Sequence, residues 1–134
     1  MGLVEELGTF LDSESTRFTL GTNLFLNMLP DEPNAAASIT ETPGGAPVHV
    51  LAGDLPAWEN ARVAVTCRST SSATARANIN DAWIQLQEIA NETLASRSWL
   101  RCKAVQSPFL MGRDPQGRTK YQVNFDCARR TTAA

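Results

Sequence analysis

The sequence predicts an α+β fold, in which a mostly antiparallel sheet of about five strands carries two helices packed on one face. Two stretches repeat apolar residues with the 3.6-residue period of a helix, and several others alternate apolar and polar residues with the period of a strand. The expected order along the 134 residues is α-β-β-β-α-β-β. Residues 1–134 are expected to form a single domain, because a chain of this length can bury a sizeable core without dividing.

An amphipathic helix of about three turns is expected at the N-terminus, ending near residues 12–14. Its apolar face is formed by Leu3, Val4, Leu7, Phe10 and Leu11. Acidic residues near its start suit the positive end of the helix dipole. A short apolar run from about Asn23 to Leu29 is expected to be a strand, although its pattern alone does not exclude a buried helical turn.

Residues 30–58 differ in composition from the rest of the chain. Five of the seven prolines lie here, together with Gly44, Gly45 and Gly53. Strands are expected at residues 36–41 and 48–51, and loop elsewhere. Several apolar residues interrupt the loop, namely Val48, Val50, Leu51, Leu55 and Trp58. They are too many for a simple spacer, so we expect a loop or arm that becomes ordered against a partner.

The clearest strand runs from Ala61 to Arg68. Its alternation places Val63, Val65 and Cys67 inward, and Arg62, Thr66 and Arg68 outward. A helix should follow, with an N-cap among residues 69–72 and an end near Thr93. Its apolar stripe is Ala75, Ile79, Ala82, Trp83, Leu86 and Ala90, with Ile89 at the edge. We expect this stripe, including Trp83, to pack on the sheet as core.

The region from Ser98 to Cys127 predicts two strands joined by a turn. The inward residues are expected to be Leu100, Cys102 and Ala104 before the turn, and Tyr121, Val123, Phe125 and Cys127 after it. The four residues Asp114-Pro115-Gln116-Gly117 fit a type I turn, with Asp at the first position, Pro at the second and Gly at the fourth. The tail after residue 128 is expected to fray.

The three cysteines all lie in apolar alternations and none are spaced as C-x-x-C. We expect Cys67, Cys102 and Cys127 to be buried, reduced thiols that act as small apolar side chains. A zinc site would need a fourth ligand, and the single histidine, His49, lies in a distant loop. No metal site is therefore expected.

Motifs for catalysis and cofactor binding are missing from the sequence. There is no phosphate-binding loop, no G-x-G-x-x-G, no H-E-x-x-H and no G-x-S-x-G. We expect no catalytic or cofactor-binding residues and no enzymatic activity. The N-terminus does not resemble a secretory signal, and no stretch approaches the roughly 18 apolar residues of a membrane span, so no membrane association is expected.

The charges are divided unevenly along the chain. Residues 1–61 hold nine acidic residues and one basic residue, whereas residues 62–134 hold eleven basic and five acidic ones. The two halves could interleave in the fold and cancel locally. Alternatively, each subunit has an acidic and a basic side, which suits head-to-tail association.

A basic patch is the second charge feature that the pattern predicts. It would form on the outer face of the sheet if the strands lie side by side, from Arg62, Arg68, Arg101, Lys103 and Lys120. Such a patch can accommodate DNA without sequence specificity. No stacking aromatic residues alternate with these bases, so a dedicated single-strand binder is not expected.

Three segments carry a resemblance to a known family. The first, residues 23–45, contains Leu24-Phe25, a Leu-Pro-x-x-Pro break at 29–33 and Gly44-Gly45. The second is residues 59–69. The third, residues 106–127, contains the motif S-P-F-x-x-G-R-D-x-x-G-R at 107–118. Their order and spacing resemble the minor capsid or tail-terminator family of long-tailed bacteriophages. The resemblance covers roughly residues 20–127, and residues 46–58 depart from it.

The resemblance implies a small α+β protein that forms a ring, usually of six subunits. Such a ring caps the completed tail tube, stops its polymerisation and joins the tail to the head connector, without an enzymatic step. The expected partners are other copies of the chain, the tube protein and the connector, with DNA passing through the lumen. The expected location is the virion, after assembly in the host cytoplasm.

Candidate interface residues follow from the exposed tips and charges. They are Phe109, Leu110, Met111 and Arg113 at the expected hairpin tip, the bases Arg62, Arg68, Arg101 and Lys103, and the acids Asp31 and Glu32. The apolar tip residues either dock on the tube or connector or fold back onto the domain. Two other functions stay open: a head-side neck or head-completion protein, and a small-ligand-binding α+β module with a pocket between the helix at 75–93 and the sheet.

Overall fold

The computed structural model describes residues 2–45, 48–49, 56–95 and 97–131. It has two helices, α1 (Leu3–Glu14) and α2 (Ser72–Gln87). The strands are β1 (Leu24–Leu26), β2 (Ala36–Thr42), β3 (Val48–His49), β4 (Pro56–Ser69), β5 (Ala90–Leu94), β6 (Arg97–Ala104), β7 (Phe109–Arg113) and β8 (Thr119–Arg130). The predicted α+β class is confirmed.

One curled sheet contains all eight strands, with the main order β1-β2-β4-β8-β6-β5. Strand β3 pairs with the start of β4, and β7 pairs with the start of β8. The pairing of β1 with β2 is parallel and the others are antiparallel. The sheet is therefore mixed and larger than the predicted one of about five antiparallel strands.

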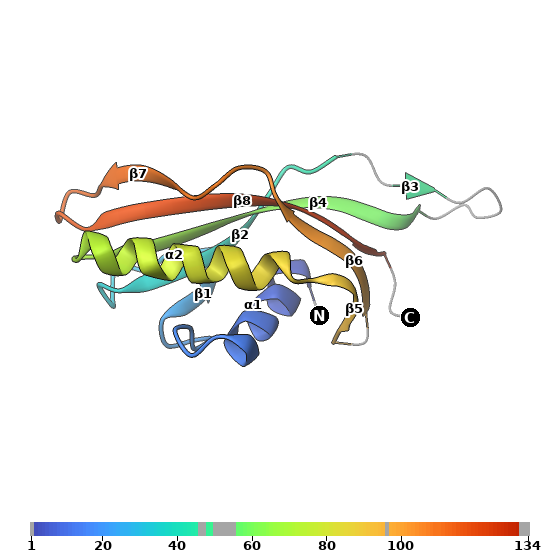
Figure 1. The fold of residues 1–134 in the computed structure, drawn as a ribbon, viewed down its shortest axis with the longest axis horizontal. Coiled ribbons are helices and arrows are strands. Elements are labelled where there is room, and N and C mark those ends of the chain that lie inside the picture. Colours follow the sequence, from blue (N-terminus) through green and yellow to red (C-terminus); the bar gives the residue numbers. More distant parts are fainter. Residues whose placement is uncertain (1, 46–47, 50–55, 96, 132–134) are drawn as a thin grey trace.

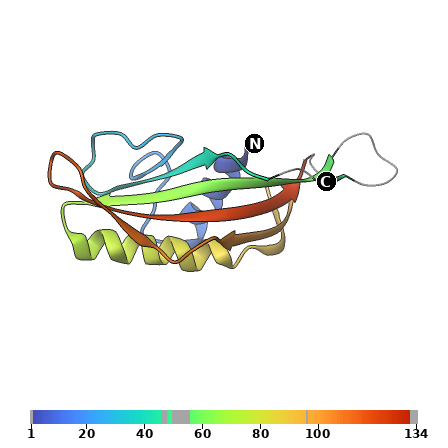
Figure 2. The ribbon, with the colours of Figure 1, turned by 90° about the horizontal axis from the view of Figure 1, so that it is seen from above.

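Both helices lie against the same face of this sheet (Figure 1). Helix α2 runs along the long central strands β4 and β8, and α1 lies beside it, under β1 and β2 (Figures 1 and 2). The core between the layers includes Leu7, Leu11, Ile39, Val63, Val65, Ile79, Leu86, Trp99, Val123 and Phe125. One stripe of each helix packs on the sheet, as the helical periodicity predicted, but Phe10 and Trp83 at the edges of these stripes are only partly buried.

Helix α2 ends six residues before the predicted limit at Thr93. The side chain of Ser71 accepts a hydrogen bond from the amide of Thr74 and caps the start of the helix. The last part of the predicted helix becomes β5, which pairs with β6. Ala90, predicted to be buried, is exposed, because strand pairing overrides the helical pattern here.

The predicted C-terminal hairpin contains an additional strand. The turn at 114–117 joins β7 to β8, not β6 to β8. Strand β8 is 12 residues long, so β7 can pair with its first part and β6 with its second part on the same side. A bulge between Trp99 and Arg101 breaks the alternation, so that Trp99 enters the core and Leu100 is exposed, against the prediction for Leu100.

The remaining differences concern the ends of elements. Strand β1 is three residues long, shorter than the predicted 23–29, and β4 starts at Pro56. Strand β8 continues to Arg130, so the predicted fraying after 128 is wrong for the next two residues. Strand β3 falls within the predicted strand at 48–51, and residues 46–47 and 50–55 of the expected arm lie outside the described residues.

Candidate functional site

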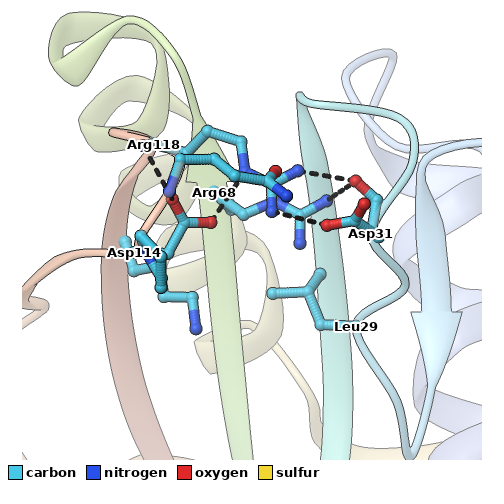
Figure 3. Close-up of a pocket in the computed structure, with 8 residues that line it drawn as sticks. Leu29, Asp31, Arg68, Asp114 and Arg118 are labelled. Carbon is cyan, nitrogen blue, oxygen red and sulfur yellow. Dashed lines mark hydrogen bonds and ion pairs between the residues drawn. The ribbon is translucent and has the colours of Figure 1, made fainter.

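The loop after β1 and the turn before β8 are held together by two buried arginines (Figure 3). These are Arg68, near the end of β4, and Arg118, directly before β8. The two segments that they join are the Leu-Pro-x-x-Pro break and the G-R-D-x-x-G-R turn. We call the contacts of Arg68 and Arg118 with residues 31–34 and Asp114 the arginine clamp.

The turn side of the clamp is built from local hydrogen bonds. The carboxylate of Asp114 accepts the amides of Gln116 and Arg118, at 3.0 and 2.9 Å, and pairs with Arg118 Nε at 2.7 Å. Gly117 has a φ of 78°, which a residue with a side chain adopts only with strain. Asp, Pro and Gly therefore stand at the positions that this turn requires, as predicted.

The loop side of the clamp consists mainly of backbone carbonyl groups. Arg118 Nη1 donates to the carbonyl of Asp31 at 2.6 Å, and its Nη2 pairs with the Asp31 carboxylate at 3.0 Å. Arg68 donates to the carbonyls of Asp31, Pro33 and Asn34, at 3.3, 2.6 and 3.2 Å. A planar guanidinium can satisfy several acceptors at once, so the two arginines fix the path of the loop.

The charges of the clamp shift the pKa values of its members. Burial opposes ionisation of Asp114, but the hydrogen bonds from Arg118 and Gln116 outweigh it and lower the pKa of this carboxyl. Burial likewise opposes the charge on Arg118, and its bonds to Asp114 and Asp31 outweigh that effect and raise its pKa. The pKa of Arg68 is lowered by burial and by the neighbouring Arg118.

An open hollow of about 380 Å³ lies beside the clamp (Figure 3). It is lined by Leu29, Asp31, Arg68, Asp114, Pro115, Gln116, Arg118 and Lys120. The guanidinium groups already donate to protein acceptors, so this arrangement is suited to holding two segments in place. Within the described ranges, no group of three or more His, Cys, Asp or Glu side chains could hold a metal ion.

A second buried charge cluster fastens α1 to the sheet. Glu6 is 1% exposed, and its Oε1 accepts the indole N–H of Trp99 at 2.8 Å. Its carboxylate also pairs with Arg97 and Arg129, with N–O distances of 3.2 and 3.0 Å. Arg129 stacks over the Trp99 ring and pairs in addition with Glu59. Sequence reasoning missed this cluster, since it considered the acids at the helix start only for their effect on the dipole.

The apolar residues of β7 remain exposed. Phe109, Leu110 and Met111 are 37%, 58% and 51% exposed, and Arg113 at the end of the strand is exposed too. A register shift lies between Leu110 and Gly112, whose φ is 111°. The structure thus keeps these side chains at the surface instead of folding them back. We call Phe109–Arg113 the β7 surface; its role in docking stays a prediction.

The predicted basic patch is smaller than the sequence pattern indicated. Arg62 and Lys103 are register neighbours of Asp126, on the sheet face away from the helices, and Arg101 shares a hollow with Arg62 and Asp126. Arg62 pairs with Asp126 at 2.8 Å. Arg68, predicted to face outward in this patch, is instead buried in the clamp, and Lys120 lines the hollow beside it.

The charge asymmetry of the sequence is partly cancelled by pairing inside the fold. Four of the six ion pairs among the described residues join the acidic first half to the basic second half: Arg97–Glu6, Arg118–Asp31, Arg129–Glu6 and Arg129–Glu59. The acids Glu5, Asp12 and Glu14 are left exposed on α1, while Arg101 and Lys103 are exposed on β6. Glu32 is exposed, next to Asp31 of the clamp.

The chain matches one known protein family over nearly its whole length. Residues 4–131 match the family described as "Bacteriophage tail terminator protein". The chain belongs to this family. The family resemblance read from the sequence is thereby confirmed, and membership makes the chain a structural protein of phage tails, which argues for a non-enzymatic role.

A solved structure has the same fold as this tail-terminator chain. It is a chain from the "Virion of native gene transfer agent (GTA) particle", with a TM-score of 0.66 and 15% sequence identity. The match covers 96% of the present chain and 94% of that chain. The search of curated proteins found no match. No helix in the described part of the tail terminator is long and apolar enough to cross a membrane.

Proposed function

We propose that this protein forms a closed ring of about six subunits that caps the phage tail tube, stops its polymerisation and joins the tail to the head connector. The observation that carries this proposal is the family match over residues 4–131. The proposed location is the virion, reached by assembly in the host cytoplasm. DNA would pass through the lumen with contacts to backbone phosphates only.

Charged side chains that are exposed on the subunit surface support contact between copies. Glu5, Asp12 and Glu14 are exposed on α1, in the helix layer, and Arg101 and Lys103 are exposed on β6, in the sheet. One subunit can therefore present acids to the bases of the next. A heterologous interface of this kind generates a ring if its rotation closes.

The β7 surface is the proposed docking site for the tube or the connector. It combines three exposed apolar side chains with an exposed arginine, Arg113. Burial of a large apolar side chain contributes about 1.5–3 kcal/mol, so docking of this surface would anchor a ring on its partner. Asp31 and Arg118 fix the adjacent loop and turn, which would keep β7 in one conformation for docking.

The ligand-binding alternative finds little support in the packing. Ala75, Ile79, Ala82 and Leu86 of α2 are fully buried against the sheet, at the place where a ligand pocket would have to lie. The other alternative, a head-side neck protein, must be distinguished from a tail terminator by a direct experiment.

Purified protein should be added to polymerising tail tubes, whose lengths are then measured by electron microscopy. A terminator shortens or fixes the lengths and appears at one tube end. A head-side neck protein would leave the tube lengths unchanged and bind only connectors.

A further inference from the structure

Two of the three cysteines meet inside the sheet. Cys102 of β6 lies directly opposite Cys127 of β8 in the antiparallel register, and their Sγ atoms are 3.6 Å apart. Both side chains are buried. Cys67 lies on β4, where its register partners are Ala37 and Tyr121, so it has no cysteine opposite to it.

The strand geometry suits a covalent link between the first two. Residues directly opposite in an antiparallel pair have Cα atoms about 4.5–5.5 Å apart, within the range of about 4.4–6.8 Å that disulfides span. The two sulfurs already touch, so a small rotation of each side chain brings them to bonding distance. The general spacing of such a strand pair therefore allows the bond without a large shift of either backbone.

We propose that Cys102 and Cys127 are an oxidisable dithiol that closes to a cross-strand disulfide between β6 and β8, while Cys67 remains a free thiol. This modification site is independent of the proposed ring and docking function. Its reactant is a two-electron oxidant, of which hydrogen peroxide is the simplest.

The chemistry balances with peroxide as the only added reactant. The sulfur of one cysteine attacks a peroxide oxygen, the O–O bond breaks, and the thiol proton leaves with the departing oxygen as water. This gives a sulfenic acid. The second sulfur then attacks the sulfenic sulfur, the S–O bond breaks and a second water leaves. The two thiols lose two protons and two electrons, and peroxide is reduced to water.

The surroundings make closure slow in the folded protein. The hydrogen bond with Cys127 and burial raise the pKa of Cys102 well above that of a free thiol. Because the thiolate is the reactive form, the raised pKa slows oxidation, and a reducing cytosol keeps the pair open. The closed bond would fasten β6 to β8 and enclose the β7 surface and its turn in one covalent loop.

The test measures which thiols survive oxidation of the folded protein. The protein is held overnight with hydrogen peroxide, quenched, unfolded and alkylated with N-ethylmaleimide. Intact mass should show one maleimide per chain in place of three, with the loss of two hydrogen atoms. A tryptic digest should join residues 121–129 to residues 102–103, with residues 63–68 alkylated. The thermal midpoint should rise by roughly 5 °C or more and return to its starting value with dithiothreitol.

Two cysteine variants distinguish the Cys102–Cys127 disulfide from oxidation at other sites. Cys67→Ser should close the same bond, and Cys102→Ser should keep both remaining thiols open. If Cys102→Ser folds poorly, the wild-type peptide map decides alone. Three maleimides after the exposure, a bond that includes Cys67, or sulfinic acid at Cys102 or Cys127 without a link would each overturn the proposal.

Discussion

Glu6 on α1 accepts the indole N–H of Trp99 on β6 at 2.8 Å, across 93 positions of sequence. The same carboxylate faces two arginines, Arg97 and Arg129. Helix and sheet are thus joined by a buried acid and not by apolar packing alone. A buried charge is costly unless it is paired, which makes this contact sensitive to replacement.

Glu6→Gln should destabilise the fold by about 3–5 kcal/mol, because the buried Arg129 and the partly buried Arg97 lose the buried carboxylate that they share. Urea unfolding followed by circular dichroism measures this. Glu5→Gln is the matched control: it lies next in sequence but is exposed, so its effect should stay within about 0.5 kcal/mol. Equal small losses for both variants would show that the buried cluster contributes little.

Asp114 should make the protein less stable in acid. Its pKa is lowered in the folded state from the ordinary 3.8, so its stabilising effect is present above that value and is lost as the pH falls through the lower folded pKa. Asp114→Asn removes this effect. The difference in thermal midpoint between the two proteins should be largest at pH 5–7 and should shrink below pH 3.8. A difference that is constant with pH would contradict the assignment.

Gly44 and Gly45 are adjacent, but only Gly44 lies so close to β4 that a Cβ would clash with the backbone. A Cβ at Gly44 would lie 2.3 Å from the carbonyl oxygen of Asn60 and 2.8 Å from Ala61 Cα, whereas one at Gly45 would meet only the Asn60 Cβ, at 3.7 Å. Gly44→Ala should therefore cost about 1–3 kcal/mol through a forced backbone shift, and Gly45→Ala much less. Thermal unfolding of both variants checks this; similar midpoints would rule out the close approach.

The double variant Phe109→Ser with Met111→Ser should fold normally, because both side chains are exposed. It should bind tail tubes or connectors at least tenfold more weakly, since two apolar contacts of about 1.5–3 kcal/mol each are removed. Co-sedimentation measures binding, and the length and infectivity of the assembled tails measure assembly. Met28→Ser removes an equally exposed apolar side chain elsewhere and should leave both unchanged. Infectious tails of normal length from the double variant would contradict the docking proposal.

Much of the fold was accessible from local patterns. Helix α1 and strand β2 lie close to their predicted limits, since amphipathic period and propensity agree there. The Asp114–Gly117 turn was also predicted, but not the strand that it follows. Phe109, Leu110 and Met111 are three apolar residues in succession, all exposed, so β7 has no alternation to reveal it, and only pairing with β8 makes it a strand.

The buried charges could not be predicted from the sequence. Arg68 alternates with apolar residues and so appeared to face solvent, but the loop at 31–34 covers it. Glu6 lies among other acids of α1, and nothing local distinguishes it from Glu5. Both depend on partners more than 30 residues away, which an alternation pattern does not specify. The sequence did contain one clue to the clamp: Asp31 lies in the Leu-Pro-x-x-Pro segment and Arg118 lies in the G-R-D-x-x-G-R segment.

The most direct test of the central claim is the mass of the purified protein by light scattering on a sizing column, at several concentrations and salt levels, with negative-stain images of the largest species. The ring proposal predicts closed rings of about six subunits that loosen as salt screens the contacts between Glu5, Asp12 and Glu14 and the bases Arg101 and Lys103. A monomer at every concentration that also fails to bind tail tubes would contradict it.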